Sequence, residues 1–156
     1  MAEHLIVSDG SKEDKYQILY AQIESLVACE TDAIARMANV AAMIHYTFNF
    51  WWTGFYRVVD GMLVLGPFQG PLACTRIAYG KGVCGAVWRE RCTQVVPDVE
   101  QFPGHIACSS ASRSEIVVPL YDATGEVMAV LDIDSDKLAT FDECDRRWLE
   151  KIVALI

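Results

Sequence analysis

The stretch FYRVVDGMLVLGPF, residues 55–68, decides the fold class of this chain. Two runs rich in β-branched and aromatic residues, FYRVV and MLVLGPF, flank the dipeptide Asp60-Gly61. Asp-Gly between two such runs is the strongest short-range signal for a β-hairpin, because both residues of its two-residue turn need positive φ angles. The sequence therefore predicts an antiparallel sheet that begins with this hairpin.

Further strand-like segments follow the hairpin. They are TQVVPDV at 93–99, SEIVVPLYD at 114–122 and EVMAVLDIDSD at 126–136, and the last two are joined by the turn residues Ala123-Thr124-Gly125. Each is short, β-branched and bounded by turn residues, as strands are. Between these segments, KGVCGAVWRER at 81–91 indicates a short helix that opens at a glycine.

Longer helices are predicted at both ends of the chain. Apolar residues recur at three- and four-residue spacing from Lys12 to about Cys29, behind Ser11 as N-cap, and a second, alanine-rich helix begins at Thr31. Phe141 introduces an amphipathic C-terminal helix. We therefore expect an α+β fold, with a central antiparallel β-sheet of about six strands and N- and C-terminal helices packed on it. We also expect residues 1–156 to form one domain, of which about 1–11 are an N-terminal extension.

Composition excludes several classes of function. The chain has 21 acidic and 13 basic residues, a net charge of -8, and no Lys/Arg cluster that could neutralise phosphates, so no nucleic acid is expected as a partner. No apolar stretch approaches the roughly 20 residues that span a bilayer, so no membrane is expected either. The first residues lack a secretory signal, and six cysteines in 156 residues are not a disulfide framework, so we expect a reducing, cytoplasmic location.

Three cysteines stand in sequence typical of loops and helix starts. Cys74, Cys84 and Cys108 lie in PLACTRIAYG, KGVCGAV and HIACSSASRS, where side chains and amides are exposed. A thiol needs such surroundings to ionise and to meet a partner, and the helix start at Cys84 favours a thiolate. The alternative for each alone is a small buried hydrophobic residue. For all three in one stretch of loops, the pattern favours thiol redox chemistry.

Carboxylates occupy one face of the last two strands. Because side chains alternate along a strand, Asp132 and Asp134 share a face with Val130, and Glu115 shares a face with Val117. Acids flanked by apolar residues are costly to bury unless a cation or a hydrogen-bond donor meets them. The ammonium group of a substrate would serve. The alternative is an open, solvated edge of the sheet.

Five aromatic residues fall within eight positions of the segment NFWWTGFY, residues 49–56. That number exceeds what one strand face needs, so at least one ring is expected to line a pocket. We expect Phe50, Trp51 and Phe55 in the core under the sheet.

These motifs together resemble a known family. In chain order, the segments that carry the likeness are FWWTGFY, GPFQGPLAC, GKGVCGA, TQVVPDV, FPGHIAC, SEIVVPL and LDIDS. Together they closely resemble the free methionine-(R)-sulfoxide reductases, which are single GAF domains. The likeness runs from about Tyr16 over nearly the whole chain. It implies reduction of free methionine-(R)-sulfoxide to methionine, with thioredoxin restoring the enzyme, and it implies no metal and no cofactor such as flavin or nicotinamide.

The resemblance also implies roles for the cysteines and for Glu115. Cys108 takes the place of the nucleophile that forms a sulfenic acid, with Cys84 as the alternative nucleophile. Cys84 and Cys74 take the places of the recycling thiols, and either can close the first disulfide. Glu115 takes the place of the proton donor beside the sulfoxide oxygen. Cys29, Cys92 and Cys144 match no cysteine position of the family.

The remaining roles concern substrate binding. Asp132 and Asp134 are expected to hold the α-ammonium, and Trp52 and Tyr56 to form an aromatic wall for the S-methyl end. The backbone amides from Ile106 to Ser109, including that of Ala107, are expected to take the substrate carboxylate. Family members are often homodimers, and the small-residue helix from Ala33 to Ala42 is a candidate interface.

Two other classes of protein compete with this interpretation. A GAF sensory module, which would bind a small ligand without turning it over, is the alternative. Many such modules belong to longer chains with signalling domains, and a chain that ends here without an output helix argues against it. A structural zinc site would need cysteines paired two to four residues apart, and the sequence has no such pair.

Overall fold

The structure, a computed structural model, describes residues 4–106, 108 and 110–156. The elements along the chain are α1 (Lys12–Val27), α2 (Ala33–Phe48), β1 (Trp52–Val59), β2 (Met62–Gln69), β3 (Arg76–Ala78), α3 (Gly82–Glu90), β4 (Gln94–Val96), a 3-10 turn (Val99–Gln101), β5 (Ser114–Tyr121), β6 (Val127–Ser135) and α4 (Glu143–Val153). The six strands form one antiparallel sheet in the order β3-β2-β1-β6-β5-β4. The expected α+β fold, with its six-stranded sheet, is confirmed.

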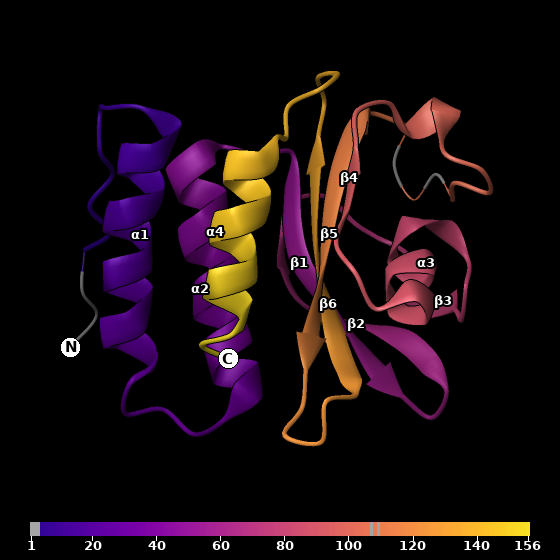
Figure 1. Cartoon of the computed structure of the whole chain (residues 1–156), viewed down its shortest axis with the longest axis horizontal. Helices are drawn as coiled ribbons and strands as arrows, with labels where there is room; N and C mark the ends of the chain where they lie inside the picture. The colour runs from indigo at the N-terminus through magenta and orange to yellow at the C-terminus, as the bar shows by residue number, and fades with distance from the viewer. Residues whose placement is uncertain (1–3, 107, 109) are drawn as a thin grey trace.

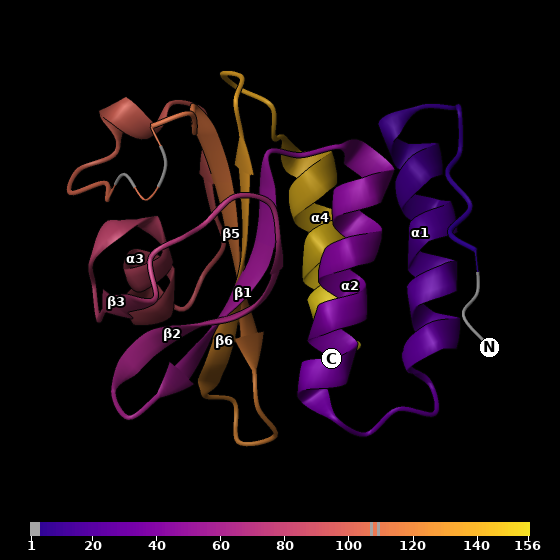
Figure 2. The same ribbon diagram turned by 180° about the vertical axis from the view of Figure 1, so that it is seen from behind.

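The sheet separates two unequal layers. Helices α1, α2 and α4 lie on one side of it, and α3 lies on the other with the loop that follows the 3-10 turn (Figures 1 and 2). Helices from both ends of the chain therefore cover the same face. None of the helices among the described residues is long and apolar enough to cross a membrane.

The hairpin and the first helix form as their sequences predict. Asp60 and Gly61 have φ angles of 48° and 75°, as a two-residue turn between β1 and β2 requires. The Ser11 hydroxyl accepts a hydrogen bond from the Asp14 amide, and the Asp14 carboxylate accepts one from the Ser11 amide, which makes a capping box. The second helix begins at Ala33, two residues later than expected, because Asp32 is its N-cap.

Two features of this region differ from the sequence-based expectation. The sequence predicts no strand at Arg76–Ala78, where β3 pairs with β2. Only Ile77 of its three residues is buried, so the segment is too short to show an alternating pattern. Trp51, expected in the core, is 37% exposed. Phe55 is fully buried and Phe50 is partly buried against the core, as expected.

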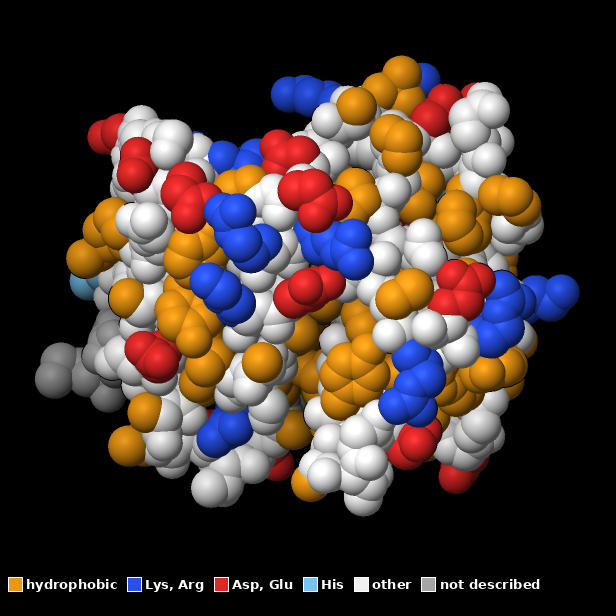
Figure 3. Space-filling view, viewed as in Figure 1, with side chains coloured by type: hydrophobic (Ala, Val, Ile, Leu, Met, Phe, Trp, Pro, Cys, Tyr) orange, Lys and Arg blue, Asp and Glu red, His pale blue; other side chains and the backbone are white. Residues whose placement is uncertain are grey.

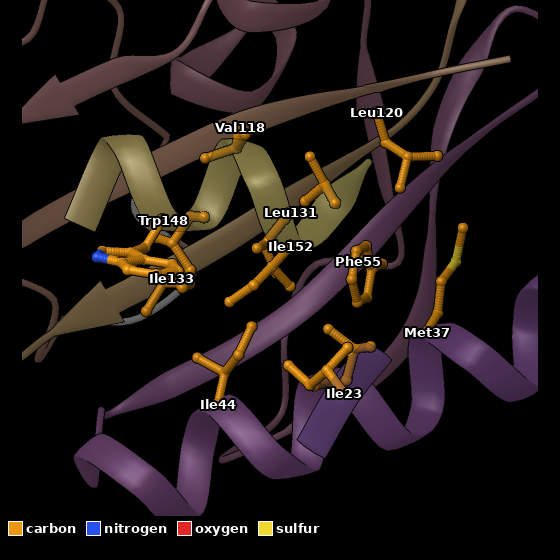
Figure 4. Close-up of a cluster of buried hydrophobic side chains, with 14 of the residues drawn as sticks. Ile23, Met37, Ile44, Phe55, Val118, Leu120, Leu131, Ile133, Trp148 and Ile152 are labelled. Atoms are coloured by element: carbon orange, nitrogen blue, oxygen red, sulfur yellow. The ribbon is translucent and has the colours of Figure 1, made fainter. Parts of the chain in front are cut away.

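The main hydrophobic core fills the space between the sheet and helices α1, α2 and α4. Figure 4 shows Ile23 and Ile44 from the helices meeting Phe55, Leu131 and Ile133 from the strands. A smaller apolar cluster, which includes Val83 and Val87 of α3, lies on the other face. On the side of the molecule that carries α4, Lys and Arg side chains are interspersed with Asp and Glu side chains, which is typical of a solvated surface (Figure 3).

Candidate functional site

A cavity lies on the α3 side of the sheet. It is bounded by strands β1, β5 and β6, by the start of α3, and by the chain segments around Ala73 and Ile106. The side chains that line it are Trp52, Tyr56, Leu72, Ala73, Ile77, Lys81, Gly82, Val83, Cys84, His105, Ile106, Cys108, Ser112, Glu115, Asp132 and Asp134. The structure thus brings together all the described residues that the sequence marks as candidates, except Cys74, which is bonded to Cys108.

Two aromatic rings form one wall of the cavity. Trp52 and Tyr56 stand on the same face of β1, with ring centroids 5.9 Å apart and ring planes 24° from parallel. Gly54 lies between them, and a Cβ atom there would come within 2.5 Å of the Trp52 ring. The Trp52 indole donates a hydrogen bond to the Pro71 carbonyl, and the Tyr56 hydroxyl donates one to the Cys74 carbonyl. The wall therefore also anchors the segment that carries Cys74.

Three carboxyl groups face the cavity from adjacent strands. Glu115 of β5 is paired with Asp134 of β6, and Asp132 points to the same face two residues earlier. Glu115 and Asp132 are only 5% and 7% exposed. The Ser112 hydroxyl donates a hydrogen bond to Asp134 Oδ1, whereas Asp132 Oδ1 has no hydrogen-bond partner in the described part of the chain. The solvated-edge alternative is therefore wrong for Glu115 and Asp132.

Burial and mutual repulsion raise the pKa values of these acids above those of free carboxyl groups. Burial raises the pKa of Glu115 well above its usual value, and the charges of Asp132 and Asp134 raise it further. Burial and the charge of Asp134 likewise raise the pKa of Asp132. Burial raises the pKa of Asp134 to about 6, against the opposing hydrogen bond from Ser112. A carboxyl group that stays protonated near neutral pH can serve as a general acid.

A disulfide joins two of the three candidate thiols. Cys74 and Cys108 are bonded, with their Cα atoms 5.5 Å apart and a sequence separation of 34. The sequence left Cys74 and Cys84 as alternative partners of Cys108, and the structure pairs Cys108 with Cys74.

Cys84 lies elsewhere than its sequence suggested. Its place in the first turn of α3 predicted an exposed thiolate, but the side chain is buried, and Asp132 and Glu115 face it. Burial, and then the charges of these two acids, raises the pKa of the Cys84 thiol well above its usual value. The thiolate prediction was wrong, because desolvation and nearby negative charge outweigh the helix dipole.

The loop between the 3-10 turn and β5 closes another side of the cavity. Ile106 is 39% exposed at its rim and lies close to Gly82, where α3 begins. The backbone amide of Cys108 donates a hydrogen bond to the Ile106 carbonyl. The substrate-carboxylate role expected of Ala107 and Ser109 falls outside the described residues.

Sequence reasoning missed two residues of the site. Ser112 hydrogen-bonds Asp134, and His105 Nε2 lies 4.0 Å from Glu115 Oε2. Nothing in the segment SSASRS distinguishes Ser112 from the serines beside it. His105 was visible as an ionisable residue in the loop of Cys108, but its distance to Glu115 depends on how that loop folds over β5.

Comparison of the chain with known proteins shows its family. The GAF domain family matches residues 32–156. GAF domain-containing protein A of Dictyostelium discoideum is 56% identical over 157 residues, which cover 100% of this chain and 99% of that protein. Free methionine-R-sulfoxide reductase of Escherichia coli is 42% identical over 145 residues, 92% of this chain and 87% of that protein. The chain belongs to the free methionine-(R)-sulfoxide reductase family of GAF domains.

A solved structure extends this likeness to three dimensions. The X-ray structure of free methionine-R-sulfoxide reductase from Neisseria meningitidis, in complex with its substrate, matches with a TM-score of 0.94 and 51% identity, over 97% of this chain and 92% of that one. Of the cysteines that resemble those of the reductase family, Cys84 and Cys108 line the cavity, and Cys74 is bonded to Cys108. Cys29 and Cys92 are free and exposed, and Cys144 is free on α4.

Proposed function

We propose that this protein is an oxidoreductase that reduces free L-methionine-(R)-sulfoxide to L-methionine, with thioredoxin as the final reductant. The observation that carries the proposal is the meeting of Cys108 and three carboxyl groups, two of them deeply buried, in one cavity. Thiol chemistry on a sulfoxide needs a nucleophilic sulfur, a proton donor for the departing oxygen and a second thiol. Family membership supports the choice of substrate.

Substrate binding uses the carboxyl groups on β6 and the aromatic wall. The α-ammonium of the amino acid pairs with Asp132 and Asp134, which satisfies the free Oδ1 of Asp132. The S-methyl end lies against Trp52 and Tyr56, since a methyl beside a polarised sulfur is well accommodated on a ring face. The loop amides from Ile106 onward take the carboxylate.

The chemical step starts from the reduced protein. The Cys108 sulfur attacks the sulfoxide sulfur, and Glu115 gives a proton to the oxygen. The sulfur–oxygen bond of the substrate breaks, methionine leaves, and the oxygen remains on Cys108 as a sulfenic acid. Because burial raises the pKa of Glu115, the acid is protonated when the substrate arrives.

Regeneration follows through the second thiol. Cys74 attacks the Cys108 sulfenic acid, water departs, and the disulfide forms. A dithiol of thioredoxin then reduces this disulfide by exchange. The Leu72 side chain, two residues before Cys74, is 89% exposed and gives a protein reductant an apolar surface beside the disulfide. For Cys84, we retain the role of a further recycling thiol as a prediction.

A coupled assay tests the proposal. NADPH, thioredoxin reductase, thioredoxin and the protein are mixed with free methionine-(R)-sulfoxide, and NADPH consumption is measured. We expect turnover with the R epimer and none above background with the S epimer. A GAF sensory module would bind the ligand and consume no NADPH, so an absence of turnover would support that class instead.

The assembly state and location stay predictions. On α2, the side chains of Ile34, Ala38, Ala42 and Tyr46 recur at four-residue spacing, and three of the four are exposed, which supports the candidate homodimer interface. Sedimentation velocity measures whether a dimer forms. Fractionation of the source cells tests the cytoplasmic location.

A further inference from the structure

A cluster of three buried side chains that can bind a metal ion lies within the cavity. The Sγ atom of Cys84 and carboxylate oxygens of Glu115 and Asp132 lie within 4.8 Å of one another, and all three side chains are buried. They come from α3, β5 and β6, so three separate elements hold them in place. When these groups lose their protons, three negative charges face one point.

The described residues offer these groups no close positive charge. Lys81 is the only Lys or Arg among the residues that line the cavity, and its side chain is exposed. Burial lowers the pKa of the nearby His105, which favours its neutral form. Asp132 Oδ1 is buried and has no hydrogen-bond partner in the same described set. A buried, unpaired oxygen in an acidic cluster favours binding of a cation from solution.

The donor types select among cations. Zn²⁺ binds thiolate sulfur at about 2.3 Å and carboxylate oxygen at about 2.0–2.2 Å, commonly with three protein ligands and one open position. Mg²⁺ and Ca²⁺ prefer oxygen ligands only. In a tetrahedral zinc site the donor atoms stand roughly 3.4–3.6 Å apart. Donors within 4.8 Å of one another therefore need to approach by at most about 1.4 Å, which side-chain rotation can supply.

We propose that Cys84, Glu115 and Asp132 bind Zn²⁺, and that the bound ion inhibits the protein by excluding the substrate. The ion occupies the position of the α-ammonium at Asp132 and withdraws the proton donor Glu115 from the reaction. The proposal rests on the proposed function only for the identity of the competing substrate. Since Cys84 lies outside the Cys74–Cys108 disulfide, the oxidised protein binds the ion as well.

The test uses the oxidised full-length protein with the three other free cysteines replaced, Cys29→Ser, Cys92→Ser and Cys144→Ser. Only Cys84 then offers a thiol. Calorimetry measures Zn²⁺ binding, and Cd²⁺ serves as an optical probe through its ultraviolet thiolate charge-transfer band. We expect one ion per chain and a band that Cys84→Ser abolishes. Asp132→Asn should weaken binding about a hundredfold, since loss of even a hydrogen-bond partner of a ligand costs about 10–100-fold.

A matched control lies directly after strand β6. Asp136→Asn removes an exposed carboxylate near the end of β6 and should leave the affinity unchanged. Absence of Zn²⁺ binding, or a Cd²⁺ band that survives Cys84→Ser, would overturn the proposal. Retention of full affinity in Asp132→Asn would overturn it too.

Competition between the metal ion and the substrate distinguishes failure of the metal site from failure of the proposed function. Free methionine-(R)-sulfoxide should displace Cd²⁺ from the oxidised protein, and Zn²⁺ should inhibit turnover competitively until a chelator is added. One ion bound through Cys84 and Asp132, in a protein that shows no reductase turnover, would support the metal site and count against the reductase. Turnover that Zn²⁺ leaves unchanged would overturn the inhibitory role while the reductase stands.

Discussion

The two faces of the sheet differ in what the same strands bury. On β6, Leu131 points into the core beneath α1, α2 and α4, whereas the next residue, Asp132, points into the cavity beside α3. On β5, Ile116 and Glu115 divide in the same way. All four side chains are buried. Leu131 and Ile116 are apolar and pack in the core, whereas Asp132 and Glu115 are acids whose pKa values burial raises.

This difference shows which face stabilises the fold and which face carries the chemistry. Burial of a Leu or Ile side chain contributes about 1.5–3 kcal/mol. Burial of an ionisable carboxyl with an unpaired oxygen is unfavourable, and a protein keeps such a group where it meets a ligand. The apolar residues on the helix-covered face therefore stabilise the fold and offset the cost of the buried acids on the cavity face. Substitutions on the helix-covered face should mainly change stability, and substitutions on the cavity face should mainly change activity.

The largest effect is expected from loss of the nucleophile. Cys108→Ser should lower turnover by about a thousandfold or more with any reductant, because no other described thiol lines the cavity except Cys84, which is held protonated. The measurement is single-turnover release of methionine from the reduced protein. Cys92→Ser, which removes an exposed thiol outside the cavity lining, is the control and should keep full activity. A methionine burst from Cys108→Ser would assign the nucleophile elsewhere.

The next effect contrasts two adjacent residues. Leu131→Ala should lower the free energy of unfolding by about 2–5 kcal/mol, because it leaves a cavity in the packed core. Asp132→Asn should leave that free energy unchanged or raise it, because the amide removes a buried ionisable group. Urea denaturation at neutral pH measures both, with Leu138→Ala at a half-exposed position as the control. Equal destabilisation by Leu131→Ala and Asp132→Asn would remove the distinction between the faces.

Local sequence signals accounted for most of the fold. The Asp60-Gly61 turn, the Ser11 cap and the alternation around Asp132 each depend on neighbours within a few residues, so the sequence alone predicts them. Strand β3 was not predicted, because its three residues show no strand pattern of their own. They form a strand because they pair with β2. Trp51 was misplaced because the direction of a ring at a strand start depends on the chain packed around it.

The site was predictable as a set of residues but not as an arrangement. Alternation put Asp132 and Asp134 on one face, and the resemblance named the three cysteines. The pairing of Cys108 with Cys74, and the burial of Cys84 against two acids, depend on contacts between segments far apart in sequence. Local signals such as a helix start therefore gave the wrong ionisation for Cys84.

Selectivity for the free amino acid is the third effect. If Asp132 pairs with the α-ammonium, an N-acetylated, amidated methionine sulfoxide leaves that carboxylate unpaired and should react roughly a hundredfold less efficiently. Asp132→Asn should reduce this discrimination, mainly by lowering kcat/KM for the free substrate, whereas Asp136→Asn should preserve it. Steady-state assays of both substrates give the ratio. Comparable kcat/KM for free and blocked substrates in the unsubstituted protein would remove the ammonium-binding role.

The smallest effect concerns the hydrogen bond from Ser112 to Asp134. Burial raises the pKa of Asp134 from 3.8 to about 6 in the folded protein, so the folded state holds a proton that the unfolded state has lost. The contribution of Asp134 to stability is therefore greatest below about pH 4 and declines as the pH rises to about 6. Ser112 donates to the carboxylate and limits this loss, because its hydrogen bond lowers the pKa.

Ser112→Ala should therefore raise the pKa of Asp134 further and extend the decline in stability to higher pH. We expect the variant to be less stable by about 1 kcal/mol at pH 7, with a smaller difference at pH 4, where the carboxyl is largely protonated in the folded state. Denaturation from pH 4 to 8 measures the difference, and the carboxyl carbon shift of Asp134 reports its pKa directly. Ser110→Ala, exposed in the same loop, is the control. Parallel stability curves for the Ser112→Ala variant and the unsubstituted protein would show that Ser112 does not stabilise the charged form of Asp134.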